Sequence, residues 1–315
     1  MSFHQNTAGN FDIDDKKNEN ILSLNLIVFQ SFDLLKKEEK MIKIFHSISI
    51  CFFLFLIILT IFSVKNVLTL NLSDRTSISC NSLNISQLHL LTFDLFGALM
   101  KTEESLHDNI AEILPTLSKN DINIFTQLWL DAYVSNFGKT FPPSLTHQPF
   151  RWIIQTSLID ILSKFGLSNL IPEGSQIFNS LLSTWANLKP KDGTIEVLTK
   201  LSKKYQLALL SNGDQETLES AIRIFPSSVN ISLIFSSDYP VNCLKPCSQM
   251  YAQALDSVSG NINQVLHVAG SAFDTHGALS FGIYSGALDP SAIHTTPTPC
   301  FAFEDIRHLP EFFKV

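Results

Sequence analysis

Charged residues are scarce in this chain, and positive charge is not in excess. Asp, Glu, Lys and Arg make up 16% of the 315 residues, and the formal net charge is −7. A surface that binds phosphates is normally basic, so we expect no nucleic-acid partner. The apolar share of 45% is enough for one large core or two smaller ones.

The five cysteines lack the spacing of a metal site. Cys243 and Cys247 are four residues apart, but no second Cys or His pair accompanies them. The other three, Cys51, Cys80 and Cys300, are scattered. We therefore interpret the cysteines as structural or free thiols and expect no metal at them.

One segment, residues 44–64, has no charged side chain at all. Its 21 residues would span roughly 31 Å as a helix, close to the hydrocarbon thickness of a bilayer. A buried core helix of this length would show a polar stripe, and this segment has none. The pattern predicts a single-pass membrane protein with a transmembrane helix or signal anchor.

The charges around this segment indicate its orientation. Lysines at 36, 37, 40 and 43 precede it, whereas Lys65 and Arg75 follow. The positive-inside rule then places the N-terminus in the cytoplasm and the larger C-terminal part outside or in a lumen. A start at Met41 would instead make the segment resemble a signal peptide, so the side that the C-terminal part faces stays open.

The rest of the chain divides by composition. Residues 1–43 are polar and are expected to form a disordered tail, and residues 65–87 form a Ser- and Asn-rich linker. From residue 88 onward, short apolar strands alternate with helices. We predict strands at 89–93, 206–210, 231–235, 265–269 and 283–285.

Helical patterns separate these strands. They cover residues 106–117, 121–136, 151–165, 175–187, 191–205 and 246–258, and another helix starts at 215. This alternation predicts an α/β fold: a doubly wound, Rossmann-like parallel sheet. Its core comprises residues 88–100 and 191–315, and the block at 101–190 is an inserted helical cap.

Polar residues follow four of the predicted strands. Asp94 ends the first strand, Ser211, Asn212 and Gly213 follow the second, and Lys245 comes after the third. Ser271 and Asp274 follow the fourth. Because the carboxyl ends of parallel strands meet at one edge of the sheet, we expect these residues to converge.

Their charges suggest roles. A carboxylate with an ordinary pKa near 4 is ionised at pH 7, so Asp94 needs no general base to act as a nucleophile. Lys245 would neutralise the two acids and orient Asp94, and Asp274 would orient Lys245 or a water. Ser211 and the following N–H groups would bind carboxylate oxygens. Taken singly, each residue also fits a helix cap or a surface position.

The four segments together resemble the motifs of the haloacid dehalogenase superfamily. They read LTFDLFGAL (91–99), LALLSNGD (207–214), CLKPCSQMY (243–251) and HVAGSAFDTHGA (267–278). Within that superfamily, the chain is most similar to the 2-haloacid dehalogenase branch. Phosphatases of the superfamily carry a second acid two residues after the nucleophile, where this chain has Phe96.

The resemblance implies an enzyme, a hydrolase that forms an ester on Asp94 with Lys245 and Asp274 as catalytic partners. It implies a small carboxylic acid or related substrate and neither metal nor other cofactor. The implied substrate-binding residues are Phe96, Ser211, Asn212, Gly213, Tyr251 and Ser271. The sequence is also compatible with a homodimer.

The chain departs from the family pattern at several positions. Ala98 and Ala269 replace a threonine and a serine, and Ser271 replaces an asparagine. The arginine that receives the halide in the family follows a Leu-Trp pair, but here Leu130 follows Leu128 and Trp129. Arg151 and Lys139 are the candidate replacements.

Three hypotheses follow. The first is a membrane-anchored hydrolase of haloacid dehalogenase type. The second is a magnesium-dependent phosphatase of the same superfamily. The third is a degenerate, non-catalytic binding domain anchored to the membrane.

Overall fold

The computed structural model describes residues 78–142 and 149–315. The predicted tail, the apolar segment at 44–64 and the first part of the linker lie outside the described residues. Within the described ranges, none of the helices is both long enough and apolar enough to cross a bilayer.

The described residues contain a five-stranded parallel sheet with the order β3-β2-β1-β4-β5. The strands are β1 (Leu90–Phe93), β2 (Gln206–Leu210), β3 (Ile231–Phe235), β4 (Val265–Ala269) and β5 (Tyr284–Ala287). The predicted parallel sheet is confirmed. β1 is central and every one of its residues is buried, which fits an apolar strand covered on both faces.

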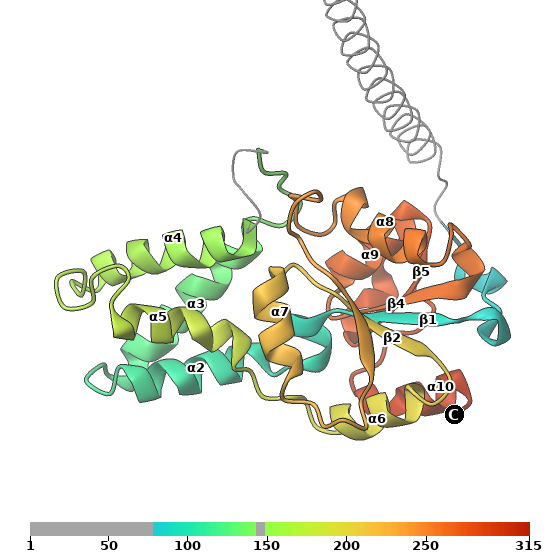
Figure 1. Cartoon of the computed structure of the whole chain (residues 1–315), viewed down its shortest axis with the longest axis horizontal. Helices are drawn as coiled ribbons and strands as arrows, with labels where there is room; N and C mark the ends of the chain where they lie inside the picture. Colours follow the sequence, from blue (N-terminus) through green and yellow to red (C-terminus); the bar gives the residue numbers. More distant parts are fainter. Residues whose placement is uncertain (1–77, 143–148) are drawn as a thin grey trace, which may run out of the picture. The chain divides into compact units, whose positions relative to one another are not determined.

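Helices cover both faces of this sheet (Figure 1). In that view α8 (Ser248–Ser257) and α9 (Ala272–Phe281) lie above the strands, and α6 (Thr194–Leu201) and α10 (Leu309–Phe313) lie below them. α7 (Gln215–Ile222) packs against β3. The sequence predicted a longer helix at 191–205. Gly193 adopts a left-handed φ of 81° at the N-cap, so α6 starts only at Thr194.

A second group of helices lies between β1 and β2 in the chain and beside the sheet in space (Figure 1). It comprises α2 (Thr102–Ile113), α3 (Lys119–Val134), α4 (Pro149–Lys164) and α5 (Gln176–Ser183). The predicted extension of α2 to residue 117 is wrong. Pro115 disfavours a helical conformation of Leu114, and the helix ends at Ile113.

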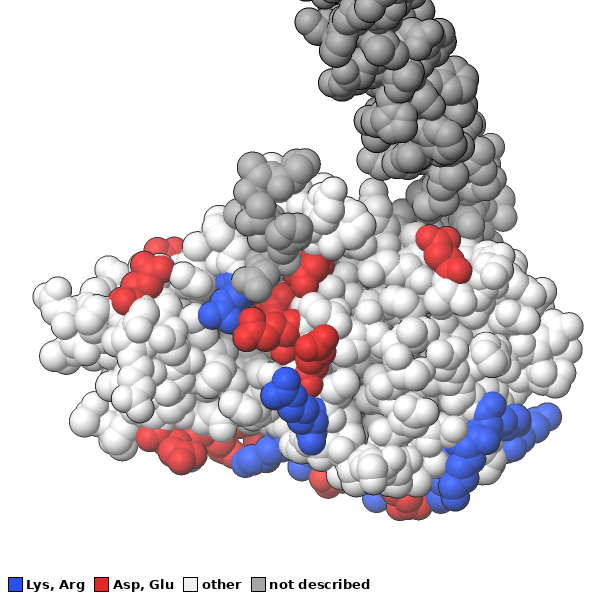
Figure 2. All heavy atoms as spheres, viewed as in Figure 1, with Lys and Arg blue, Asp and Glu red and all other residues white. Residues whose placement is uncertain are grey.

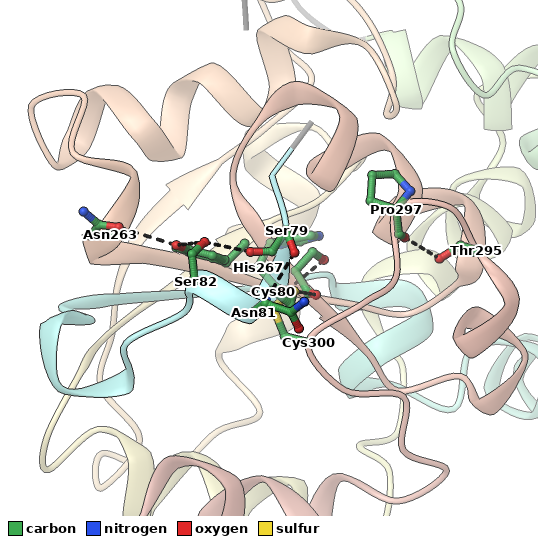
Figure 3. The surroundings of a disulfide bond; sticks show 11 residues. Ser79, Cys80, Asn81, Ser82, Asn263, His267, Thr295, Pro297 and Cys300 are labelled. Carbon is green, nitrogen blue, oxygen red and sulfur yellow. Dashed lines mark hydrogen bonds between the residues drawn. A yellow bond between two sulfur atoms is a disulfide. The ribbon is translucent and has the colours of Figure 1, made fainter. Parts of the chain in front are cut away.

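Two disulfides fix segments around the core. Cys80 pairs with Cys300, which ties the linker to the segment after β5 (Figure 3). The Ser82 hydroxyl also lies 2.9 Å from the Tyr284 hydroxyl. Cys243 pairs with Cys247. These four cysteines are therefore structural, one of the two alternatives left open by the sequence.

Charged side chains are sparse on the face shown in Figure 2. Acidic side chains gather around α7, which carries Glu216 and Glu219, and basic ones lie near α6 and α10. Most of the described surface in this view belongs to uncharged residues. This face has no broad basic area.

Candidate active site

Asp94 stands at the carboxyl end of the central strand, and its two oxygens have different partners. Oδ2 accepts a hydrogen bond from the Gly97 N–H at 2.9 Å and so caps the turn at Leu95–Leu99. Oδ1 lies 2.9 Å from Lys245 Nζ and 3.2 Å from Ser211 Oγ. Asp94 thus fills the cap position and also places one oxygen among polar groups of the site.

Lys245 joins the two acids. Its ammonium contacts Asp94 Oδ1, lies 2.6 Å from Asp274 Oδ2 and donates to the Leu210 carbonyl at 3.0 Å. Burial lowers the pKa of this ammonium, but the charges of Asp274 and Asp94 outweigh burial and raise the pKa above its usual 10.5. Lys245 therefore stays charged at neutral pH, with three acceptors for its three protons.

Asp274 is held on both oxygens. Oδ2 also lies 3.0 Å from His267 Nε2, and Oδ1 accepts from the Tyr251 hydroxyl at 2.8 Å. His267 Nδ1 in turn lies 2.9 Å from the Thr92 hydroxyl inside the sheet. Burial raises the pKa of Asp274, but the charges of Lys245 and His267 outweigh it, and the pKa falls well below its usual range.

Backbone contacts bring these loops together. A Cβ on Gly270 would overlap the backbone of Gly97 and Ala98, so only glycine lets the loops after β1 and β4 pass this closely. The backbone N–H of Lys245 donates to Asn212 Oδ1 at 2.7 Å, and this hydrogen bond holds the loop that carries the lysine. The Cys243–Cys247 disulfide brackets the same lysine.

The remaining predicted residues lie around this cluster in different ways. Ser271 caps α9, because its hydroxyl accepts from the Asp274 N–H at 3.3 Å. The Gly213 carbonyl accepts from the Ser237 N–H at 3.3 Å, and Gly213 lies close to the Phe96 ring. Tyr251 is fully buried with its hydroxyl on Asp274. Substrate contact by these three residues stays a prediction.

Aromatic rings form the wall on the side of the inserted helices. Phe96 stacks on Phe150 with ring centroids 5.1 Å apart, and meets Tyr133 at 5.8 Å and Trp185 at 5.7 Å. The Tyr133 hydroxyl has the Asn212 side chain as a hydrogen-bond partner. Burial, and then the charge of Asp94, raise the pKa of Tyr133 well above 10, so this phenol stays protonated.

Neither candidate replacement for the missing arginine is placed beside the nucleophile. Arg151 is 40% exposed and pairs with Glu216 at 4.0 Å. Lys139 donates to Asn136 Oδ1 at 2.8 Å on the surface. Leu130 itself packs against the hydrophobic core.

A cavity of about 870 Å³ lies between the turn after β1 and the helices α2 and α3. Its lining includes Phe96, Gly97 and Lys191 together with Met100, Lys101 and residues of α2 and α3. Lys191 Nζ donates to the Gly97 carbonyl at 2.5 Å, and burial lowers the pKa of this lysine. Asp94 does not line the cavity.

The groups that contact Lys245 at this site include two carboxylates, Asp94 and Asp274. Mg²⁺ needs oxygen ligands in octahedral geometry. Lys245 contacts both carboxylates here, and the residue two positions after Asp94 is the aromatic Phe96. Within residues 78–142 and 149–315, no cluster of three or more Asp, Glu, His or Cys side chains could hold a metal.

Three contributors escaped the sequence reasoning. His267 could have been noticed as the single ionisable residue in an apolar strand, VLHVA. Tyr133 continues the buried face of α3 one turn after Trp129. Trp185 had no such signal, because only the packing of the inserted helices on the core brings it to Phe96.

The sequence is similar to those of known proteins. The family model described as haloacid dehalogenase-like hydrolase matches residues 91–288, which include every residue of the cluster. The chain belongs to the haloacid dehalogenase-like hydrolases. The (S)-2-haloacid dehalogenase 4A of Burkholderia cepacia is 25% identical over 227 residues, which are 71% of this chain and 91% of that protein.

Solved structures of this family share the fold. One of them is the L-2-haloacid dehalogenase of Xanthobacter autotrophicus with chloropropionic acid covalently bound. The alignment covers 72% of this chain and 98% of that chain. The TM-score is 0.58 at 18% identity. The putative HAD-hydrolase YfnB of Bacillus subtilis bound to magnesium gives 0.58 at 13% identity, over 73% of this chain and 100% of its own.

Proposed function

We propose that this haloacid dehalogenase-like hydrolase uses Asp94 as a nucleophile, without a metal, on a small 2-halogenated carboxylic acid or a related substrate. The observation that carries the proposal is the setting of Asp94 Oδ1. This oxygen lies 2.9 Å from a buried ammonium, and the residue two positions later, Phe96, stacks on another aromatic ring instead of supplying a second acid.

The first step forms an ester. An Asp94 oxygen bonds to the substrate carbon that carries the leaving group, and the leaving group departs with the bonding electron pair. Lys245 and the Gly97 N–H orient the carboxylate during this attack. Ser211, Asn212 and the N–H groups of their turn hold the carboxylate of the substrate.

The second step is hydrolysis of that ester. Water adds to the carbonyl carbon of Asp94, the oxyanion is stabilised by Lys245 and Ser211, and the alcohol product leaves. Asp274 keeps Lys245 in position through the 2.6 Å ion pair, and Tyr251 and His267 hold Asp274. Of the two protons of the water, one ends on the oxygen of the alcohol product and the other goes to solvent.

Location is a second part of the proposal. Disulfides persist in oxidising compartments, and the part of the chain that the structure describes has two of them. This favours a catalytic domain outside the cell or in a lumen, anchored by residues 44–64, the orientation expected from the flanking lysines. Mass spectrometry of non-reduced tryptic peptides tests both pairs directly.

Activity on two substrate classes separates the three hypotheses. The full-length protein is incubated with 2-chloropropionate, 2-bromopropionate and an aryl phosphate, each with and without magnesium. We expect halide release that is independent of magnesium, lost in Asp94→Asn and retained in Asp160→Asn, which changes an exposed acid. Magnesium-dependent phosphate release would favour the phosphatase, and no turnover of either class would favour the binding domain.

A further inference from the structure

Three N-x-S sequons, the acceptor sequence for N-glycosylation, follow the apolar segment at 44–64. They begin at Asn71, Asn84 and Asn230. Asn71 lies outside the described residues, and the other two have a place in the fold. Asparagine and serine are frequent in this chain, so a sequon carries weight only where its asparagine is exposed and leaves room for a bulky group.

Asn84 meets this condition. It is exposed and is the N-cap of the short 3₁₀-helix η2 (Ile85–Gln87), which leads toward β1. Its Oδ1 accepts hydrogen bonds from the Ser86 N–H at 3.1 Å and from the Ser86 hydroxyl at 2.8 Å. Both bonds engage the amide oxygen, whereas a glycan bonds to the nitrogen Nδ2. Modification would therefore leave this cap in place.

Asn230 lies directly before an edge strand. It is exposed and precedes β3, which among the described residues has a neighbouring strand on one side only. The strand reads ISLIF, carries no charge, and all of its residues are half-buried or exposed. An apolar edge of this kind can pair with a strand of another chain unless it is covered. A glycan on Asn230 would cover the start of this edge.

Both asparagines lie away from the active site. Asn84 precedes β1 and Asn230 precedes β3, so each is near the amino end of a strand. Asp94 follows the carboxyl end of β1, and in a parallel sheet the carboxyl ends meet at the opposite edge. A glycan on either asparagine would therefore leave access to the nucleophile open.

We propose that Asn84 and Asn230 carry N-linked glycans. The inference rests on the location proposed for the domain, outside the cell or in a lumen, and not on its reaction. The co-reactant is an oligosaccharide on a lipid diphosphate, delivered by a membrane-bound transferase. Nδ2 bonds to the anomeric carbon of the sugar, and the bond from that carbon to the diphosphate oxygen breaks. The lipid diphosphate leaves with the electron pair, and one Nδ2 proton is released.

Translation of the full-length chain into endoplasmic-reticulum microsomes tests the proposal. Peptide N-glycosidase removes N-linked glycans, and the shift on a denaturing gel reports how many are present. We expect Asn84→Gln and Asn230→Gln each to lose one glycan relative to the wild type, and the double variant to lose two. A loss in only one single variant overturns the assignment of the other. Attachment occurs on the entering chain, so a variant that folds poorly still reports on its sequon.

Two matched controls test the sequon at Asn84. Asn81→Gln changes another exposed asparagine, three residues earlier, which begins no sequon, so all glycans should remain. Ser86→Thr keeps the sequon and should keep the glycan, whereas Ser86→Ala should lose it. Retention of the glycan in Ser86→Ala would contradict the assignment.

Protease added outside the sealed microsomes separates failure of this inference from failure of the proposed location. If the C-terminal part is protected and neither Asn84→Gln nor Asn230→Gln loses a glycan, the inference is overturned and the location stands. If the protease digests the C-terminal part, the location fails and the inference fails with it. The proposed reaction is independent of both, and halide release is expected to be equal before and after glycosidase treatment.

Discussion

Replacement of Lys245 by methionine is the perturbation with the largest expected effect on the site. The two carboxylates contact one nitrogen at 2.9 and 2.6 Å, so their oxygens are separated by no more than the sum of these distances. At about 5 Å and an effective dielectric constant of about 20, two like charges repel by about 3 kcal/mol. Loss of one partner of a buried pair costs a similar amount, about 3–5 kcal/mol.

The destabilisation of Lys245→Met should depend on pH. Without the ammonium, the repulsion of about 3 kcal/mol between the two carboxylates is relieved when one of them takes up a proton at low pH. Urea unfolding of the full-length protein measures the loss at pH 7.5 and at pH 4.5, where we expect it to shrink. Adding Asp274→Asn to Lys245→Met should restore at least about 1 kcal/mol. A loss below about 1 kcal/mol, or an equal loss at both pH values, would refute the reasoning.

Three further changes test other parts of the structure. Phe96→Asp places an acid among aromatic rings, and we expect urea titration to show about 3–5 kcal/mol of destabilisation. We expect no gain of magnesium-dependent phosphatase activity. A variant as stable as the wild type would contradict the packing of Phe96 among these rings. Reduction of the Cys80–Cys300 disulfide, mimicked by Cys80→Ser with Cys300→Ser, is expected to cost about 2–5 kcal/mol, and an unchanged unfolding midpoint would count against the bond. The lowered pKa of Asp274 contributes stability that is present above pH 3.8 and is lost as the pH falls below that value. Asp274→Asn should flatten this acid limb of the stability profile, which acid titration followed by circular dichroism measures.

The sheet could be predicted from the sequence because its strands are short apolar runs that end in polar residues. β2, β3 and β4 occupy the predicted residues, and β1 and β5 differ by a few positions at their ends. Asp94 stood out because an acid after LLTF is costly to bury without partners. The partners found in space, Lys245 and Ser211, were among the predicted residues.

Contacts between the inserted helices and the core could not be predicted from the sequence. Tyr133, Phe150 and Trp185 come from three different helical segments and meet only because those segments pack together over Phe96. Their sequence pattern indicates a buried face and not which ring lies beside Asp94. The Cys80–Cys300 pair spans 220 residues, a separation at which spacing carries no information. The membrane segment at 44–64 stays a prediction.

The covalent role of Asp94 has a direct test in heavy-oxygen water. The full-length protein in excess over 2-chloropropionate completes one turnover, and the peptide that contains Asp94 is then weighed by mass spectrometry. Because water attacks the ester carbonyl, we expect one heavy oxygen in the Asp94 carboxylate and ordinary oxygen in the alcohol product. Heavy oxygen in the product with an unlabelled Asp94 would mean direct attack by water, and would contradict the account.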